Sequence, residues 1–244
     1  MGGVISPTCV VAGGRPRLDI DVFGPDGLVR LDLLRARTRY YLGVDLGKEQ
    51  SHSAMVVVER AELVYRQEMR DPVTMQFPTE TRYFVRHAER FPLGVPFTDV
   101  ATRIRELVRR PPLQGWVKVV VDGTAVGAAV LEMLRGNGGL GCRLIPVVIT
   151  GGDRTSVSPG PDGSGYTVPK RDLLHGLVVA FENEWLEMAG SIGPALEVMV
   201  QELRSVRGGR NGGFSGMSGA PTDDMVLALS LAWWRAKREQ GWLG

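Results

Sequence analysis

The apolar segments of this chain are short, and their lengths and periods predict five strands. Three of them follow one another closely at residues 40–47, 53–60 and 62–70, which predicts three antiparallel strands joined by tight turns. Two more are expected at 116–124 and 142–150, where WVKVVVDGT and CRLIPVVIT are apolar runs typical of buried strands. The sheet is therefore expected to begin with an antiparallel meander.

Apolar residues spaced three and four apart predict the helices. They are expected at residues 97–110, 125–136, 169–185, 194–206 and from Thr222 to about 238. Segments rich in proline, aromatic residues, glycine or serine are expected to be irregular: 71–97, 151–166 and 207–221. Because strands and helices alternate after the meander, the central strands should be parallel. We predict an α/β fold with a mixed central sheet flanked by helices.

The first 38 residues mix glycine, proline and arginine without a lasting period. We therefore divide the chain into an N-terminal extension at 1–38, which need not be ordered, and one domain at 39–244. With 43% hydrophobic and 23% charged residues, the composition is that of a globular protein. No apolar run reaches the roughly 18 residues of a membrane-spanning helix, and the first residues lack a signal-peptide pattern. We expect a cytoplasmic protein without a membrane partner.

Cysteine usage and net charge narrow the kinds of site. Cys9 and Cys142 belong to no CxxC or Cys/His cluster, so neither a zinc site nor a disulfide framework is expected. The net charge of +2 is too small to indicate nucleic-acid binding by itself.

The charge is unevenly distributed along the chain. Residues 30–41, 103–110 and 168–174 are locally basic, and such runs most often only face solvent. In the third run, Lys170 and Arg171 stand at an expected helix start after a flexible loop. These two residues are candidates for contacts to DNA phosphates, which would be insensitive to sequence and weakened by salt.

Four aspartates stand out by position. Asp45 ends the first expected strand, Asp122 ends the strand at 116–124, and Asp223 and Asp224 open the last helix. Each alone is a weak signal, because Asp-Gly also forms plain turns and an acid in a first helical turn suits the helix dipole. Open α/β sheets bind ligands at the carboxyl ends of their strands. If the two strands are central neighbours, Asp45 and Asp122 lie side by side.

Carboxylates brought together in this way need a cation, because like charges repel one another and raise a pKa. Mg²⁺ binds carboxylates, water and phosphate oxygens, and two ions about 3.5–4 Å apart can hold the attacking and leaving oxygens of a phosphodiester. Three or four carboxylates are enough for this chemistry, without a cysteine or histidine nucleophile. The acids therefore predict a site for two Mg²⁺ or Mn²⁺ ions.

Five segments of the chain occur in a characteristic order: YYLGVDLGKEQSHSAMVVVER, VVVDGTAVGAAVLEMLR, IPVVITGGD, VPKRDLLHGL and TDDMVLALSLAWW. In these segments the chain resembles the nuclease domain of tailed-phage terminase large subunits, most of all the forms met in prophages. Together the five segments cover about Tyr40 to Arg235. The resemblance implies an RNase H-like fold and a nuclease that cuts concatemeric DNA during genome packaging, using two Mg²⁺ or Mn²⁺ ions.

The resemblance also implies site residues and partners. The metal-binding acids of the family fall on Asp45, Asp122, Asp223 and Asp224. The expected partners are double-stranded DNA and a separate terminase ATPase, small terminase subunit or portal. The sequence departs from the family at two points. Thr222 stands where close relatives carry histidine, and no GxxxxGK[ST] phosphate loop is present, so the resemblance does not extend to the packaging ATPase.

Three other interpretations stay open at the level of sequence. The first is a junction-resolvase-like nuclease on the same fold, which would differ in the shape of its DNA substrate. The second is half of a sugar-kinase or actin-like ATPase, because GVDLG followed by a meander also resembles the phosphate loop of that superfamily. The third is a non-catalytic prophage remnant that binds DNA or partner proteins.

Overall fold

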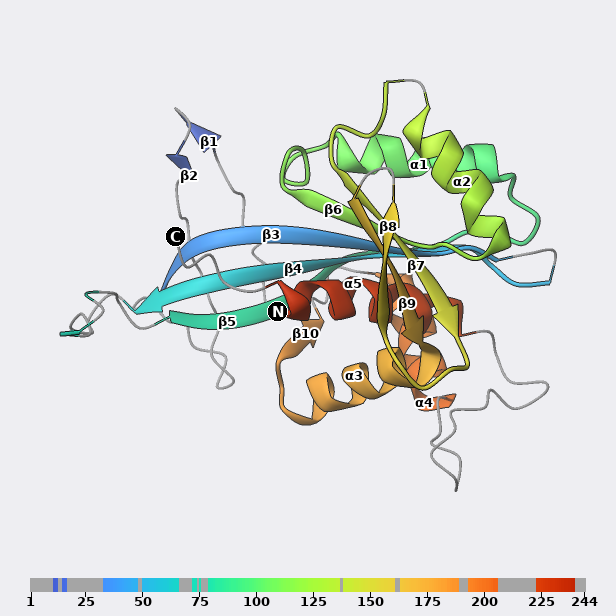
Figure 1. Ribbon diagram of the computed structural model, residues 1–244. Coiled ribbons are helices and arrows are strands. Elements are labelled where there is room, and N and C mark those ends of the chain that lie inside the picture. The colour runs from blue at the N-terminus through green and yellow to red at the C-terminus, as the bar shows by residue number, and fades with distance from the viewer. Residues whose placement is uncertain are drawn as a thin grey trace.

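The structure is a computed structural model that describes most of the chain. The described residues are 11–12, 15–16, 33–47, 50–65, 72–73, 75, 79–136, 138–160, 163–188, 193–205 and 223–239. They form a mixed sheet of eight strands with helices on both faces (Figure 1). The α/β fold class with a mixed central sheet flanked by helices, predicted from the sequence, is confirmed.

The predicted antiparallel meander exists, but two of its strands differ from the prediction. It consists of β3 (Leu33–Asp45), β4 (Ala54–Tyr65) and β5 (Thr79–Arg90), paired in that order. The expected break between residues 60 and 62 is wrong, because Ala61 is buried and pairs with Thr38 instead of forming a turn. One long β4 therefore replaces two expected strands, and β5 is the third strand of the meander.

β5 lies in the segment 71–97 that the sequence analysis expects to be irregular. Its apolar face is narrow: Tyr83 and Val85 are buried, while Arg82 and Arg86 lie on the other face. A register shift between Val57 and Val58 of β4 further interrupts the alternation. The strand is held by pairing to β4 rather than by a strong local pattern.

The parallel part of the sheet follows the prediction closely. After α1 (Phe97–Val108), β6 (Val117–Asp122) pairs parallel with β3. After α2 (Ala125–Arg135), β7 (Arg143–Thr150) pairs parallel with β6. Both helices lie on the same face of the sheet (Figure 1). Because β3, β6 and β7 are parallel, their carboxyl ends lie at the same end of the sheet.

Short strands complete both sides of the sheet. β8 (Ser156–Gly160) and β9 (Gly163–Pro169) form a hairpin, with β9 parallel to β7, and β10 (Leu186–Met188) pairs with β5. The strand order is therefore β10-β5-β4-β3-β6-β7-β9-β8. The expected loop at 151–166 is wrong where it overlaps β8 and β9, because hydrogen bonds to β7 make strands of a segment with little apolar alternation.

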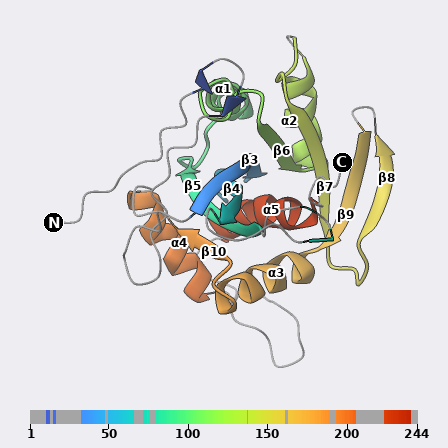
Figure 2. The same ribbon diagram turned by 90° about the vertical axis from the view of Figure 1, so that its left-hand side faces the viewer.

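The second face of the sheet carries α3 (Lys170–Glu182), α4 (Pro194–Ser205) and α5 (Asp224–Arg238). Figure 2 shows α5 between the sheet and α3, and α5 contacts β3, β4 and α3. Alternate residues of β3 serve the two cores: Leu42 and Val44 pack toward α1 and α2, whereas Tyr41 packs toward α5.

Little of the predicted N-terminal extension is described. β1 (Val11–Ala12) and β2 (Arg15–Pro16) pair with each other, and β3 begins inside the expected extension at Leu33. The rest of residues 1–32, the glycine-rich segment 207–221 and Thr222 lie outside the described residues. In the part of the chain that is described, no helix is long and apolar enough to cross a membrane.

Candidate metal centre

Two of the predicted acids end neighbouring central strands. β3 and β6 are parallel, and Val44 pairs with Val121, so Asp45 and Asp122 are the next residues at adjacent strand ends. Neighbouring strands lie about 4.8 Å apart, and residues two apart share a face of the sheet. Since Tyr41 of β3 and Val120 of β6 belong to the cores that pack on α5, both aspartates face α5.

α5 brings the third acid to the same place. A Cβ atom on Gly43 would lie only 2.0 Å from the carbonyl oxygen of Ala228, so the absence of a side chain lets α5 lie directly on β3. Ala228 follows Asp224 by one helical turn, which puts both on the same side of α5. Gly43 likewise precedes Asp45 by two residues on its strand. The Gly43–Ala228 contact therefore positions Asp224 over Asp45.

The four predicted acids form one electrostatic cluster. Asp45, Asp122 and Asp224 are only 8%, 9% and 4% exposed. Burial raises the pKa of Asp45 well above its usual range, and repulsion from Asp122, Asp224 and Asp223 raises it further. Lys170 acts in the opposite direction. Residues that are far apart in the sequence are thus close enough for their charges to interact strongly.

Asp122 is held at the start of the β6–α2 connection. Its carboxylate accepts hydrogen bonds from the Thr124 amide at 3.1 Å and from the Thr124 hydroxyl at 3.0 Å. Burial nevertheless raises the pKa of Asp122, against the lowering effect of Thr124 and of the Ile149 amide. A Cβ atom on Gly127 would overlap the Asp122 carbonyl oxygen at 1.6 Å, so the first turn of α2 packs directly on this strand end.

Lys170 and Arg171, the two candidates for DNA contact, lie in different surroundings. Lys170 is the first residue of α3, and its Nζ lies 2.5 Å from Asp223 Oδ2. Arg171 instead pairs with Asp153 at 3.2 Å and with Asp172 at 3.6 Å. The structure therefore places Lys170 at the carboxylate cluster and turns Arg171 toward the loop between β7 and β8.

Glu202 of α4 is a site residue that the sequence analysis missed. Its Oε2 accepts hydrogen bonds from the amides of Met225 at 2.8 Å and Val226 at 3.2 Å, which are free donors of the first turn of α5. Burial raises the pKa of Glu202 to about 7, although these amides and Arg90 lower it. Glu202 therefore caps α5 from another helix. The signal in the sequence is an acid three residues after the buried Met199 on an apolar helix face.

Asp224 is fixed by two further contacts. Its Oδ2 accepts a hydrogen bond from the His52 amide at 3.1 Å and lies 3.6 Å from Nη2 of Arg90. Arg90 Nε is also 4.0 Å from Glu202 Oε1, so this arginine joins both carboxylates. The His52 ring contacts the Phe91 carbonyl oxygen at 2.7 Å.

A groove with a volume of about 720 Å³ lies between the β3–β4 turn and the loop from β5 to α1. Its lining is uncharged and consists of Gly47, Gln50, Ser51, Ser53, Pro92, Gly94, Val95, Pro96 and Phe97. None of the four aspartates lines this groove. It is therefore a feature of the β3–β4 turn and the β5–α1 loop rather than part of the carboxylate cluster.

The donor set fits a hard divalent cation by chemical type. Asp45, Asp122, Asp223 and Asp224 supply carboxylate oxygens, the ligands preferred by Mg²⁺ and Mn²⁺. Among the described residues, no three Asp, Glu, His or Cys side chains converge as a ready ligand set. Asp122, Asp223 and Asp224 are engaged by Thr124, Lys170 and Arg90 instead. Binding of an ion would require these side chains to turn toward Asp45.

Comparison with known proteins adds no relative: no family model, no curated protein and no solved structure matches this chain. Functional argument therefore rests on the carboxylate cluster and its surroundings.

Proposed function

We propose that this chain is a metal-dependent DNA endonuclease of the terminase large-subunit type. The proposal rests on one observation. Four acids lie together where β3 and β6 end and α5 begins: Asp45, Asp122, Asp223 and Asp224. Three of the four are almost completely buried. Burying several carboxylates together is costly unless a cation compensates them. The resemblance of the sequence to terminase nucleases supports the same assignment.

Each acid has a distinct part in this proposal. Asp45 is central, because the other three aspartates all act on its charge. Asp45, Asp122 and Asp224 would hold the ions together with Asp223, and Asp122 and Asp224 are oriented by the contacts described above. When bound, two Mg²⁺ or Mn²⁺ ions would supply positive charge that activates water and offsets the charge of the phosphodiester transition state.

Lys170 would change partner when substrate binds. In the structure its ammonium group pairs with Asp223. If Asp223 turns toward a cation, Lys170 is left at the opening of the site, at the start of α3, where a DNA phosphate would be its new partner. Contacts of this kind follow the backbone and carry little sequence preference. A separate terminase ATPase, small terminase subunit or portal would be the partners of such a nuclease.

The test is cleavage of supercoiled plasmid in Mn²⁺, Mg²⁺ or EDTA by the wild type, Asp45→Asn and Asp224→Asn. We expect cleavage with either metal, none in EDTA, and a loss of about 10²-fold or more in both variants, since each removes a stabilising charge. Asp99→Asn is the matched control, because Asp99 is an exposed acid of α1, and it should cut as the wild type does.

Two outcomes would contradict the proposal. Folded wild-type protein that cuts neither supercoiled, linear nor four-way-junction DNA with any divalent metal is not a nuclease by itself. Cleavage that persists in Asp45→Asn would remove this residue from the site. Preference for the junction over linear DNA would instead support the junction-resolvase interpretation.

A further inference from the structure

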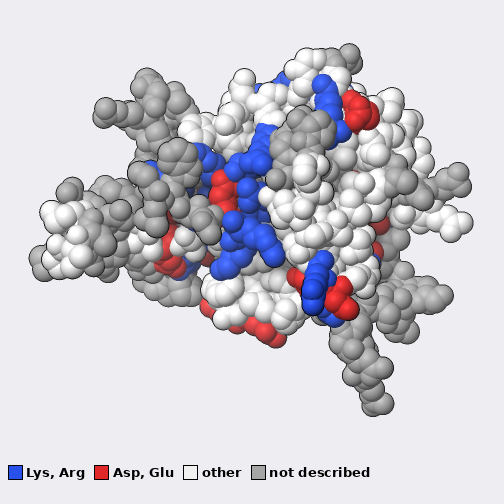
Figure 3. All heavy atoms as spheres, viewed as in Figure 1, with Lys and Arg blue, Asp and Glu red and all other residues white. Residues whose placement is uncertain are grey.

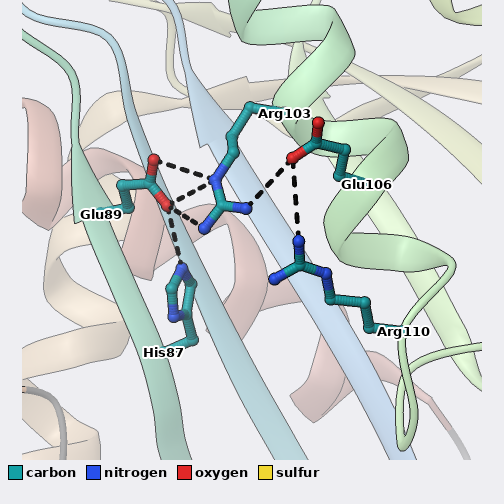
Figure 4. Close-up of polar contacts among 5 residues, drawn as sticks. All are labelled: His87, Glu89, Arg103, Glu106 and Arg110. Carbon is teal, nitrogen blue, oxygen red and sulfur yellow. Dashed lines mark hydrogen bonds and ion pairs between the residues drawn. The ribbon is translucent and has the colours of Figure 1, made fainter.

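Two arginines of the basic segment at 103–110 pair with carboxylates within the fold. Figure 4 shows Arg103 between two carboxylates: its Nε lies 3.0 Å from Glu89 Oε2, and its Nη1 lies 3.4 Å from Glu106. Arg110 also approaches Glu106, at 4.0 Å, and His87 contacts Glu89 at 3.3 Å. This surface of α1 and β5 is therefore a balanced network of opposite charges.

Unbalanced positive charge gathers elsewhere, around the C-terminal end of α5. Figure 3 shows Lys and Arg side chains in a band across the middle of one face, over this end of α5 and the start of β6. We call the following residues the basic strip: Arg39, Arg60, Lys118, Arg143, Arg235, Lys237 and Arg238. They come from β3, β4, β6, β7 and α5, and six of the seven lie outside the basic runs seen in the sequence.

Strand pairing explains why these residues share one face of the sheet, where Arg60 is itself buried. Arg39 pairs with Arg60 across β3 and β4, and Lys118 pairs with Arg143 across β6 and β7. On each strand, these four residues are an even number of positions away from residues that pack on α5. They therefore lie on the face of the sheet that α5 covers, beyond the last turn of that helix. Glu239, just after α5, bonds to Lys118 and fixes the helix end beside them.

The cations of the basic strip are more numerous than their acidic partners. Glu62 pairs with Arg60, and Glu239 serves both Lys118 and Arg235. Among the described residues, no carboxylate pairs with three further residues of the strip: Arg143 of β7 and Lys237 and Arg238 of α5. Like charges therefore repel one another along the strip.

Two lysines of the strip have lowered pKa values. Burial is the main cause for Lys118; Glu239 raises this pKa, and the charges of Arg235 and Arg143 lower it. Burial also lowers the pKa of Lys237, with an added contribution from Arg60. An anion bound over the strip would relieve this repulsion.

Aromatic rings hold several of these charges in place. The Arg39 guanidinium lies 4.6 Å from the ring of Trp116, and the Lys237 ammonium lies 3.7 Å from the ring of Trp185. Trp116 and Trp185 are 46% and 38% exposed, so both pairs are at the surface. Cations held by rings lose less side-chain entropy when they bind an anion. The strip is therefore prearranged for an anionic partner.

We propose that the basic strip binds the phosphate backbone of double-stranded DNA, as a contact separate from the carboxylate cluster. α5 has 15 residues and separates the two places by about 22 Å at roughly 1.5 Å per residue. A row of cations on five elements suits a continuous row of phosphates, whereas a protein partner would require an apolar centre in the surface. The choice of DNA as the polyanion rests on the proposed function.

The experiment measures binding without cleavage. A labelled 30-base-pair duplex is titrated in EDTA at several salt concentrations, with fluorescence anisotropy as the signal. Lys237→Gln/Arg238→Gln should bind about tenfold more weakly, with a salt slope lower by about 2, because each lost phosphate contact reduces the slope by about 1. Arg143→Gln should lose about threefold with a slope lower by about 1. Arg109→Gln/Arg110→Gln, two exposed arginines at the end of α1, should bind as the wild type does.

The same titration in an Asp45→Asn background separates this inference from the proposed function. If strip variants bind DNA less well but the wild type never cuts DNA, the strip stands and the nuclease assignment fails. If all strip variants bind with wild-type affinity and salt slope, the inference is overturned, whether or not the protein cuts. Unchanged DNA binding with lost binding to poly-glutamate would assign the strip to an acidic protein instead. Arg143→Gln alters an exposed side chain without a ring contact, so it keeps the test valid if the double variant unfolds.

Discussion

Gly43→Ala tests the contact that positions the carboxylates. Gly43 lies on β3 under α5, and a Cβ atom there would be 2.0 Å from the Ala228 carbonyl oxygen and 2.7 Å from the Ala232 amide nitrogen. Both neighbours are backbone atoms of a helix, so no side-chain rotation relieves the overlap. The added methyl group must push α5 away from β3.

The size of the effect follows from these distances. Real Cβ atoms essentially never approach within 3.0 Å of another heavy atom, so α5 has to move by roughly 1 Å or more. Overpacking of a core costs about 1–3 kcal/mol, and a displaced helix places this site at the upper end. For a protein of this size, 2–3 kcal/mol corresponds to a Tm lower by about 4–12 °C. Asp224 moves with α5, so cleavage should fall by about 10²-fold.

The measurement is thermal unfolding followed by circular dichroism, with plasmid cleavage measured in parallel. Gly176→Ala is the matched control, because it makes the same chemical change inside α3, where the nearest atom to a new Cβ is Trp233 Nε1 at 3.6 Å. Alanine favours a helix interior over glycine by about 0.5–1 kcal/mol, so this variant should melt slightly higher than the wild type. A Gly43→Ala protein that melts within 1 °C of the wild type would refute the close packing of α5 on β3.

Three further predictions concern acidic side chains. Glu202→Ala should lower the free energy of unfolding, measured in urea, by about 1–3 kcal/mol. Glu202→Gln should lower it less, because glutamine keeps an acceptor for the α5 amides. Wild-type stability in both variants would contradict the capping of α5 by Glu202. Burial raises the pKa of Glu239, but Lys118 and Tyr41 outweigh it and leave this pKa lowered, so Glu239 stabilises the fold above the carboxyl's ordinary pKa and less as pH falls through the lowered one. Glu239→Gln should therefore melt lower at pH 7, with a difference that shrinks as pH falls below the ordinary range of a carboxyl group. Asp45→Asn in EDTA should melt higher than the wild type at pH 8, because it removes a buried charge whose pKa is raised, and the gain should shrink as the wild-type acid becomes protonated at lower pH; a lower melting temperature at pH 8 would contradict the clustering.

Local patterns in the sequence were sufficient for much of the fold. The helices α1 to α4 and the strands β6 and β7 fall close to their predicted ranges, since the spacing of their apolar residues reflects one period over one face. The same patterns located Asp45 and Asp122 at strand ends and Asp224 at a helix start. Each of these properties depends on residues only a few positions apart.

Tertiary structure alone decided how these elements meet. β5 and the β8–β9 hairpin are strands because neighbouring strands offer hydrogen bonds to them, which no local pattern reports. The basic strip gathers residues from five elements, and Glu202 reaches the first turn of α5 from α4, so both arrangements depend on the packing of distant elements.

The carboxylate cluster shows both contributions together. The sequence by itself determined that aspartates end two strands and open one helix. That these ends converge follows from the parallel pairing of β3 with β6 and from the approach of α5 over Gly43. The tertiary structure also places Lys170 beside Asp223 of the carboxylate cluster, whereas Arg171 pairs with Asp153 outside it. Pairing and packing join residues that are about 180 positions apart, as between Asp45 and Asp224, and such contacts are set by the complete fold rather than by any segment of the sequence.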